Sequence, residues 1–159
     1  MKTVIVVSDT HGNVSALEKL RPLIAENDYF IHLGDGVADT RELRKDFPEK
    51  TYFCAGNCDF FAPYPTEGIL DIEGCRIFYC HGHKYGVKSG LARLAAEAKS
   101  RGCDVALYGH THTAAVTEID GVTLLNPGAL RFYGENAAYA YLVVNGTKCT
   151  HVFVGDTMR

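Results

Sequence analysis

The sequence contains no apolar run long enough to span a bilayer, no basic stripe and no Cys-X-X-Cys pair. The first absence argues against a membrane protein. Sixteen basic and nineteen acidic residues give a net charge of -3, so we expect no nucleic-acid-specific surface. Only Met1 and Lys2 precede the first predicted strand, and we therefore expect no secretory signal and a cytoplasmic protein.

The six cysteines are interpreted as reduced thiols that pack as small hydrophobic side chains, because most lie inside or beside apolar strands. They are Cys54, Cys58, Cys75, Cys80, Cys103 and Cys149. Low-complexity tracts and linkers are also missing. With 159 residues, the chain is expected to form one domain over residues 1–159 that buries most of its unfolded surface.

The first half of the chain alternates predicted strands and helices. Strands are expected at Thr3–Val7, Tyr29–Leu33 and Thr51–Cys54. One helix is expected after an Asn13 cap, with an apolar face that extends to Ile24, and another over 39–46, closed by Pro48. This short strand–helix–strand spacing implies parallel strands joined by right-handed crossovers.

The second half is dominated by hairpin signals. Pairs of apolar strands flank Glu73-Gly74, Asp120-Gly121 and Asn145-Gly146, over residues 69–80, 116–125 and 139–154. One helix is expected over Leu91–Arg101, ended by Gly102. These patterns predict an α/β fold in which two mixed β-sheets pack face to face with helices outside, a four-layer αββα sandwich.

Five apolar runs each end in a metal-type ligand beside a glycine. In chain order these ligands are Asp9, His11, Asp35, Asn57, His81, His110 and His112. Parallel strands present their C-terminal ends on one edge, where ligands bind in such folds, and we therefore expect the side chains to converge. Carboxylate, imidazole and amide ligands without a thiolate suit Mn, Fe, Zn, Ni or Co better than a structural zinc cluster.

Seven ligands are too many for one tetrahedral ion. They suit two divalent ions about 3.5–4 Å apart that share one carboxylate. Asp35 is predicted to be the bridging ligand, because its flanking glycines allow it to lie close to both ions.

The ordered motifs Asp-X-His, Gly-Asp, Gly-Asn, His-Gly-His and Gly-His-X-His resemble those of the calcineurin-like metallophosphoesterase superfamily over nearly the whole chain. The Gly-Asn-Cys-Asp block and the Asn126-Pro127-Gly128 turn are similar to its small bacterial and archaeal phosphodiesterase branch. The resemblance implies one metal held by Asp9, His11, Asp35 and His112, and another held by Asp35, Asn57, His81 and His110. It favours manganese, with nickel, iron and zinc as alternatives.

The resemblance also implies a water or hydroxide nucleophile between the ions, with Asp35 and Asn57 in catalytic positions and Asn57 also binding substrate. Many relatives have histidine where this chain has Cys58, which is interpreted as a packed small side chain. His83 is then a candidate to assist the leaving group, with a structural histidine as the alternative. Arg131 is a candidate to bind substrate phosphate, with an exposed loop residue as the alternative.

Two further polar residues are expected to have structural roles. Asp59 follows the predicted ligand Asn57 and is expected to orient a neighbour rather than to react. His32 lies between two apolar residues of a predicted strand, and a core histidine with satisfied hydrogen bonds is the better interpretation.

These implications predict a metal-dependent phosphoric ester hydrolase, a phosphodiesterase that acts on small phosphodiesters. One alternative is a phosphomonoesterase or nucleotide phosphatase. The other is a non-catalytic metal-binding scaffold for partner proteins, a use that the superfamily also makes of its fold. The intact ligand set argues against the scaffold. The resemblance alone favours a homo-oligomer, either a dimer or a tetramer.

Overall fold

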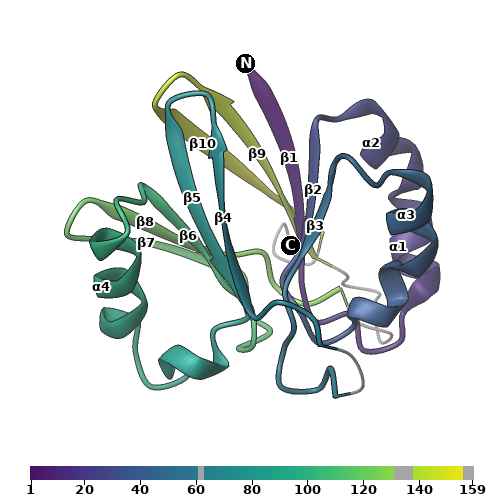
Figure 1. Cartoon of the computed structure of the whole chain (residues 1–159), viewed down its shortest axis with the longest axis horizontal. Helices are drawn as coiled ribbons and strands as arrows, with labels where there is room; N and C mark the ends of the chain where they lie inside the picture. Colours follow the sequence, from purple (N-terminus) through teal and green to yellow (C-terminus); the bar gives the residue numbers. More distant parts are fainter. Residues whose placement is uncertain (61–62, 131–137, 156–159) are drawn as a thin grey trace.

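Two five-stranded β-sheets pack face to face (Figure 1). The computed structural model describes residues 1–60, 63–130 and 138–155. The first sheet has the strand order β10-β9-β1-β2-β3. Its strands are β1 (Lys2–Val7), β2 (Tyr29–His32), β3 (Thr51–Phe53), β9 (Tyr139–Asn145) and β10 (Lys148–Val154). Strands β1, β2 and β3 run parallel, whereas the β9–β10 hairpin joins β1 in an antiparallel direction.

The second sheet has the strand order β4-β5-β6-β8-β7. Its strands are β4 (Glu67–Ile72), β5 (Cys75–Cys80), β6 (Val105–Leu107), β7 (Ala115–Ile119) and β8 (Val122–Asn126). Strands β5, β6 and β8 are parallel, and β4 and β7 pair antiparallel at the two edges. Both sheets are therefore mixed, as predicted, and all three predicted hairpins are confirmed.

Helices cover the outer face of each sheet, which confirms the predicted layers. They are α1 (Val14–Lys19), α2 (Arg21–Glu26), α3 (Arg41–Asp46) and α4 (Ala92–Ser100), with short 3₁₀ turns η1 (Val37–Thr40) and η2 (His83–Tyr85). In Figure 1, α1, α2 and α3 lie on the right, against the first sheet, and α4 lies on the left, against the second. No helix among the described residues is long and apolar enough to cross a membrane.

The single helix predicted after Asn13 is divided at Leu20, and that part of the prediction is wrong. Asn13 does cap α1, because its side chain accepts a hydrogen bond from the Ala16 N–H at 3.1 Å. A second helix, α2, then begins with Pro22 in its first turn. Proline has no N–H to donate and its ring clashes with the preceding turn, so one continuous helix cannot pass through it.

Strand β1 is buried on both faces. Val4 and Val6 point into the core between the sheets, whereas Ile5 and Val7 pack against the helices. All four side chains are fully buried. A strand of this kind appears in the sequence as an unbroken apolar run. Because the strand is fixed by burial on both faces, the residues that follow it lie at a fixed position at the edge of the sheet.

Candidate metal centre

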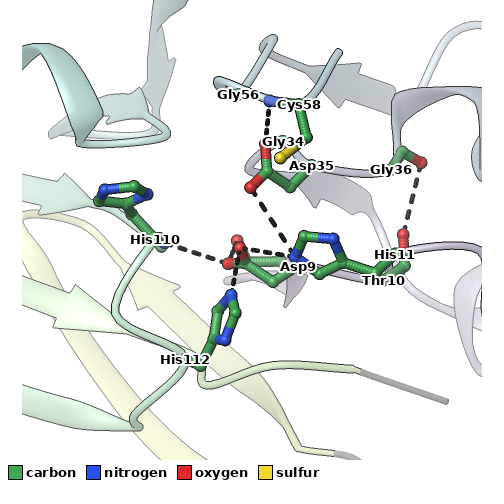
Figure 2. A network of polar contacts seen from close by, with 12 residues as sticks. Asp9, Thr10, His11, Gly34, Asp35, Gly36, Gly56, Cys58, His110 and His112 are labelled. Atoms are coloured by element: carbon green, nitrogen blue, oxygen red, sulfur yellow. Dashed lines mark hydrogen bonds and ion pairs between the residues drawn. The ribbon is translucent and has the colours of Figure 1, made fainter.

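The loops that follow β1, β2, β5 and β6 meet along one edge of the sandwich. Backbone hydrogen bonds join them in pairs: the Asp9 N–H donates to the Gly34 carbonyl at 3.0 Å, and the Gly109 N–H donates to the His81 carbonyl at 2.8 Å. The two sheets are joined where the His110 N–H donates to Asp9 Oδ2 at 3.1 Å (Figure 2). The predicted ligands of both sheets therefore converge, as the strand order requires.

The backbone at this edge adopts an unusual conformation. Seven non-glycine residues of the described chain have positive φ, and five of them are predicted ligands: Asp9, His11, Asp35, His110 and His112. The other two, Glu73 and Asp120, lie in hairpin turns. Left-handed backbone costs L-residues about 1–3 kcal/mol each and gathers at functional sites, where the surrounding structure imposes it. The loops are thus shaped to aim these side chains inward.

The first group of ligand atoms belongs to Asp9, His11 and His112, whose donor atoms lie within 4.8 Å of one another. The Asp9 carboxylate is at its centre. Its Oδ1 lies 3.1 Å from His112 Nε2 and 3.5 Å from His11 Nε2 (Figure 2).

The second group belongs to Asp35, His81 and His110, again within 4.8 Å. Asp35 Oδ2 lies 3.3 Å from His81 Nε2, which in turn lies 3.2 Å from His110 Nδ1. The other ring nitrogen of His81 donates to the Leu33 carbonyl at 2.8 Å, which leaves Nε2 free to act as a ligand. The same Asp35 oxygen lies 3.7 Å from His11 Nε2, so this carboxylate faces both groups.

The two carboxylates are buried without a permanent cation beside them. Asp9 is fully buried and Asp35 is 3% exposed. In the part of the chain that the structure describes, their ion pairs are all with histidines. A buried carboxylate is stable when it is paired or bound to a metal, and the six imidazole and carboxylate groups of the two ligand groups match the ligands of divalent transition metals. The donor set therefore fits metal ions.

Asp35 and His81 stabilise each other in their charged forms. Burial acts to raise the pKa of Asp35, but the hydrogen bond and charge of His81 outweigh it, and the pKa is well below its usual range. Burial acts to lower the pKa of His81, but the bond to Asp35 and the charge of Asp9 outweigh it, and the pKa is raised. A metal cation between these atoms would supply the positive charge that the imidazolium proton supplies without it.

Asp59 holds the loop that carries Asp35. Its Oδ2 accepts the N–H groups of Asp35 at 2.7 Å and Gly56 at 2.8 Å, and its Oδ1 accepts those of Gly36 at 3.0 Å and Val37 at 3.1 Å. Four backbone donors on one carboxylate join the loop after β2 to the loop after β3. The sequence-based expectation that Asp59 orients neighbours agrees with these contacts.

Gly56 provides the space for Asp35. A Cβ atom at position 56 would lie 2.2 Å from Asp35 Oδ1, far inside van der Waals contact. The sequence indicates only the flanking glycines Gly34 and Gly36 for this role. The close approach also needs a glycine on the neighbouring strand end, because the backbones at 34 and 56 are adjacent.

Asn57 and Cys58 lie exposed beside the ligand groups. The Cys58 N–H donates to Asp35 Oδ1 at 2.8 Å, and Asn57 Nδ2 lies 3.6 Å from the Cys58 sulfur. The Cys58 sulfur is also within 4.8 Å of ligand atoms of His11 and Asp35 (Figure 2). The interpretation of Cys58 as a packed side chain is wrong, because the backbone bond to Asp35 turns its side chain toward the site.

His83 and Arg131 are the two remaining predicted site residues. His83 lies next to the second group, with its ring 5.4 Å from that of His81 and 6.2 Å from that of His110. Its buried Nδ1 makes no hydrogen bond within the described ranges, and burial followed by the charge of His81 lowers its pKa. Arg131 lies outside the described residues.

A buried hydrogen-bond chain supports the loop that carries His11, and sequence reasoning missed most of it. His32 is fully buried, accepts the Gly34 N–H at 3.0 Å and lies 3.0 Å from Thr10 Oγ1. The Thr10 hydroxyl donates to Asp39 at 2.6 Å, and the same carboxylate oxygen accepts the N–H of Gly12 at 2.8 Å. His32 is thus the satisfied core histidine that was expected, whereas no short motif identifies Thr10 or Asp39.

Comparison with known proteins gives consistent matches. The chain matches the calcineurin-like phosphoesterase superfamily domain over residues 1–148. It is 31% identical over 150 residues to the probable metallophosphoesterase YsnB of Bacillus subtilis, covering 92% of this chain and 87% of that protein. It is 27% identical over 169 residues to the phosphodiesterase YfcE of Escherichia coli, covering 89% and 88%. A crystal structure of a predicted phosphoesterase from Streptococcus pneumoniae has a TM-score of 0.81 and 28% identity, covering 98% and 90%.

The chain therefore belongs to the calcineurin-like phosphoesterase superfamily, a family of metal-dependent phosphoester hydrolases. The predicted family, the fold of two mixed sheets with outer helices and the enzyme class are confirmed.

Proposed function

We propose that the protein is a two-metal phosphodiesterase that hydrolyses small phosphodiesters. The observation that supports this most directly is the position of Asp35. Its Oδ2 lies 3.3 Å from His81 Nε2 and 3.7 Å from His11 Nε2, so one carboxylate oxygen faces a ligand of each group. An oxygen in that position suits a ligand shared by two ions about 3.5–4 Å apart.

Each of the two proposed ions would take ligands from both sheets. One ion would be held by Asp9, His11, Asp35 and His112, and the other by Asp35, Asn57, His81 and His110. When bound, divalent ions supply a nucleophile at near-neutral pH and neutralise the phosphate oxygens. Manganese is the expected metal, with nickel, iron and zinc as alternatives.

The chain's own residues would orient the ester. Asn57 is exposed beside the ligands and is proposed to contact the substrate phosphate, together with Arg131. His83 is proposed to contact the leaving oxygen, because its ring lies beside both His81 and His110. In the metal-free protein, partial desolvation beside the site and the Asp35 carboxylate raise the pKa of the Cys58 thiol, and a neutral thiol is a poor proton donor. We therefore expect a preference for esters with good leaving groups.

The decisive experiment is hydrolysis of a bis-aryl phosphodiester and a mono-aryl phosphate by chelator-stripped protein, with Mn²⁺, Ni²⁺ or Zn²⁺ added back. We expect metal-dependent cleavage that is faster on the diester, and uptake of two ions per chain. Faster turnover of the monoester would favour the phosphomonoesterase alternative. Binding of metal without turnover of either ester would favour the scaffold.

A further inference from the structure

The hairpin tips of the two sheets contact each other at the end of the sandwich opposite the metal centre (Figure 1). The Gly74 N–H, in the β4–β5 turn, donates to the Gly146 carbonyl, in the β9–β10 turn, at 3.0 Å. The Glu73 carboxylate adds two more links, since it accepts the Gly146 N–H at 2.6 Å and the amino terminus of Met1 at 2.6 Å. The sheets are therefore held close together at this end.

Two cysteines lie next to this contact, one on each sheet. Cys75 follows Gly74 directly and begins β5, and Cys149 lies three residues after Gly146 on β10. Both belong to the apolar core between the sheets. The Gly74–Gly146 bond brings the start of β5 beside the β9–β10 turn, and Cys149 packs against the core cluster that contains Cys75, so both thiols point into the same part of the core. Interaction with the partner thiol is also the largest influence on the pKa of each cysteine.

The two thiols differ in accessibility and in acidity. Cys75 is only 1% exposed, whereas Cys149 is partly exposed. The hydrogen bond from the Cys75 thiol lowers the pKa of Cys149 and raises that of Cys75. This is the asymmetry of a reactive dithiol, in which an accessible thiolate reacts first and a protected partner completes the exchange.

We propose that Cys75 and Cys149 form a thiol–disulfide exchange site that reversibly links the two sheets. The oxidant is a low-molecular-weight disulfide. The Cys149 thiolate attacks one sulfur of that disulfide, forms a mixed disulfide and releases a thiolate, which takes the proton of Cys75. The Cys75 thiolate then attacks the Cys149 sulfur, and the second small thiolate leaves and takes up the proton that Cys149 had given to solvent. The protein loses two hydrogens, and one small disulfide becomes two thiols.

The cysteine pair lies at the end of the sandwich opposite the metal centre, so neither thiol touches the predicted ligands. Cys75 begins β5, and the predicted ligand His81 follows the other end of the same strand. The link would fix the distance between the two sheets at this end. The first sheet contributes Asp9 and Asp35 to the metal centre, and the second contributes His81, His110 and His112. It closes a loop of more than seventy residues, and such a link restricts the unfolded chain strongly.

The test uses the intact reduced protein, without metal, incubated with oxidised glutathione. Mass spectrometry should show the loss of two hydrogens with no glutathione adduct, and peptide mapping should join positions 75 and 149. The melting temperature should rise by roughly 5–15 °C and return on reduction. Cys75→Ser should retain glutathione on Cys149, because the second thiol is gone. Cys149→Ser should take up little glutathione, because Cys75 is buried.

The matched control is Cys103→Ser, which removes another buried thiol and should leave disulfide formation intact. All of these variants should keep wild-type metal-dependent hydrolysis under reducing conditions. A stable glutathione adduct on the wild-type protein, a disulfide between other cysteines or no reaction in oxidised glutathione would each overturn the proposal.

Discussion

The substitution Asp59→Asn should weaken both the fold and the metal centre, although Asp59 is not itself a predicted ligand. The carboxylate accepts two N–H groups on each oxygen, at 2.7 and 2.8 Å on one and at 3.0 and 3.1 Å on the other. An asparagine amide has the same shape but only one acceptor oxygen. Its NH₂ group would face two backbone donors and could accept from neither.

The magnitude follows from the donors that lose their partner. Depending on the orientation of the amide, these are the N–H groups of Asp35 and Gly56 or those of Gly36 and Val37. A buried donor left unsatisfied costs about 1–3 kcal/mol. Two such donors, with some relaxation of the loops, should lower the free energy of unfolding by about 2–4 kcal/mol, or the melting temperature by roughly 5–15 °C.

The metal centre should respond as well. The Asp35 N–H is one of the four bonds, and loss of a group that orients a ligand typically weakens metal affinity by about 10–100-fold. Urea unfolding of the metal-free protein measures the first effect, and titration with Mn²⁺ measures the second. The matched control is Asp120→Asn, an identical chemical change at an exposed hairpin turn, which should change stability by less than about 0.5 kcal/mol.

Two results would refute this reasoning. If Asp59→Asn were as stable as the control, the four bonds would not hold the loops together. If stability fell by the expected amount while Mn²⁺ affinity stayed at the wild-type value, Asp59 would support the fold but would not position Asp35.

Three further predictions concern single side chains. Asp35→Asn should reduce metal-dependent hydrolysis by roughly a hundredfold or more with an unchanged circular dichroism spectrum, and near-normal turnover would exclude a bridging carboxylate. Cys58→Ala should keep most of the activity, and a large loss in the same assay would give the thiol a direct role. Burial lowers the pKa of His32 to about 4, so the unfolded chain binds its proton below about pH 6.5 while the folded chain does not. The free energy of unfolding should therefore fall between pH 7.5 and 5.0 by about 2 kcal/mol more in the wild type than in His32→Gln, and equal slopes in urea titrations would contradict the assignment.

Local sequence patterns predicted a strand or turn correctly where the residues of that element alone determine its structure. The unbroken apolar run of β1 and the Asn145-Gly146 turn each identify their element, because burial on both faces and turn geometry restrict which residues fit. The helix after Asn13 shows the limit of periodicity. Its apolar face continues past Pro22, but the helical backbone cannot, because the restrictions of proline outweigh the apolar pattern.

The environment of a side chain was harder to predict. Cysteine is a small side chain that is usually packed in the core, but Cys58 is exposed beside Asp35, where its own N–H donates to that carboxylate. Asp39 lies in an ordinary polar helix start, and only the fold places its carboxylate against the Thr10 hydroxyl, 29 positions earlier. Contacts of this kind leave no periodic signal, because they join loops rather than faces of one element.

The sequence by itself determined which residue types follow each strand, and with them the family, the two-sheet fold and the candidate ligands. It could do so because ligand type, strand end and glycine are adjacent along the chain. Only the tertiary structure decided the distances between the ligand atoms, since Asp9 Oδ1 and His112 Nε2 are 103 positions apart in sequence and 3.1 Å apart in space. Packing of the two sheets creates that proximity, and it likewise brings Cys75 and Cys149 together at the opposite end.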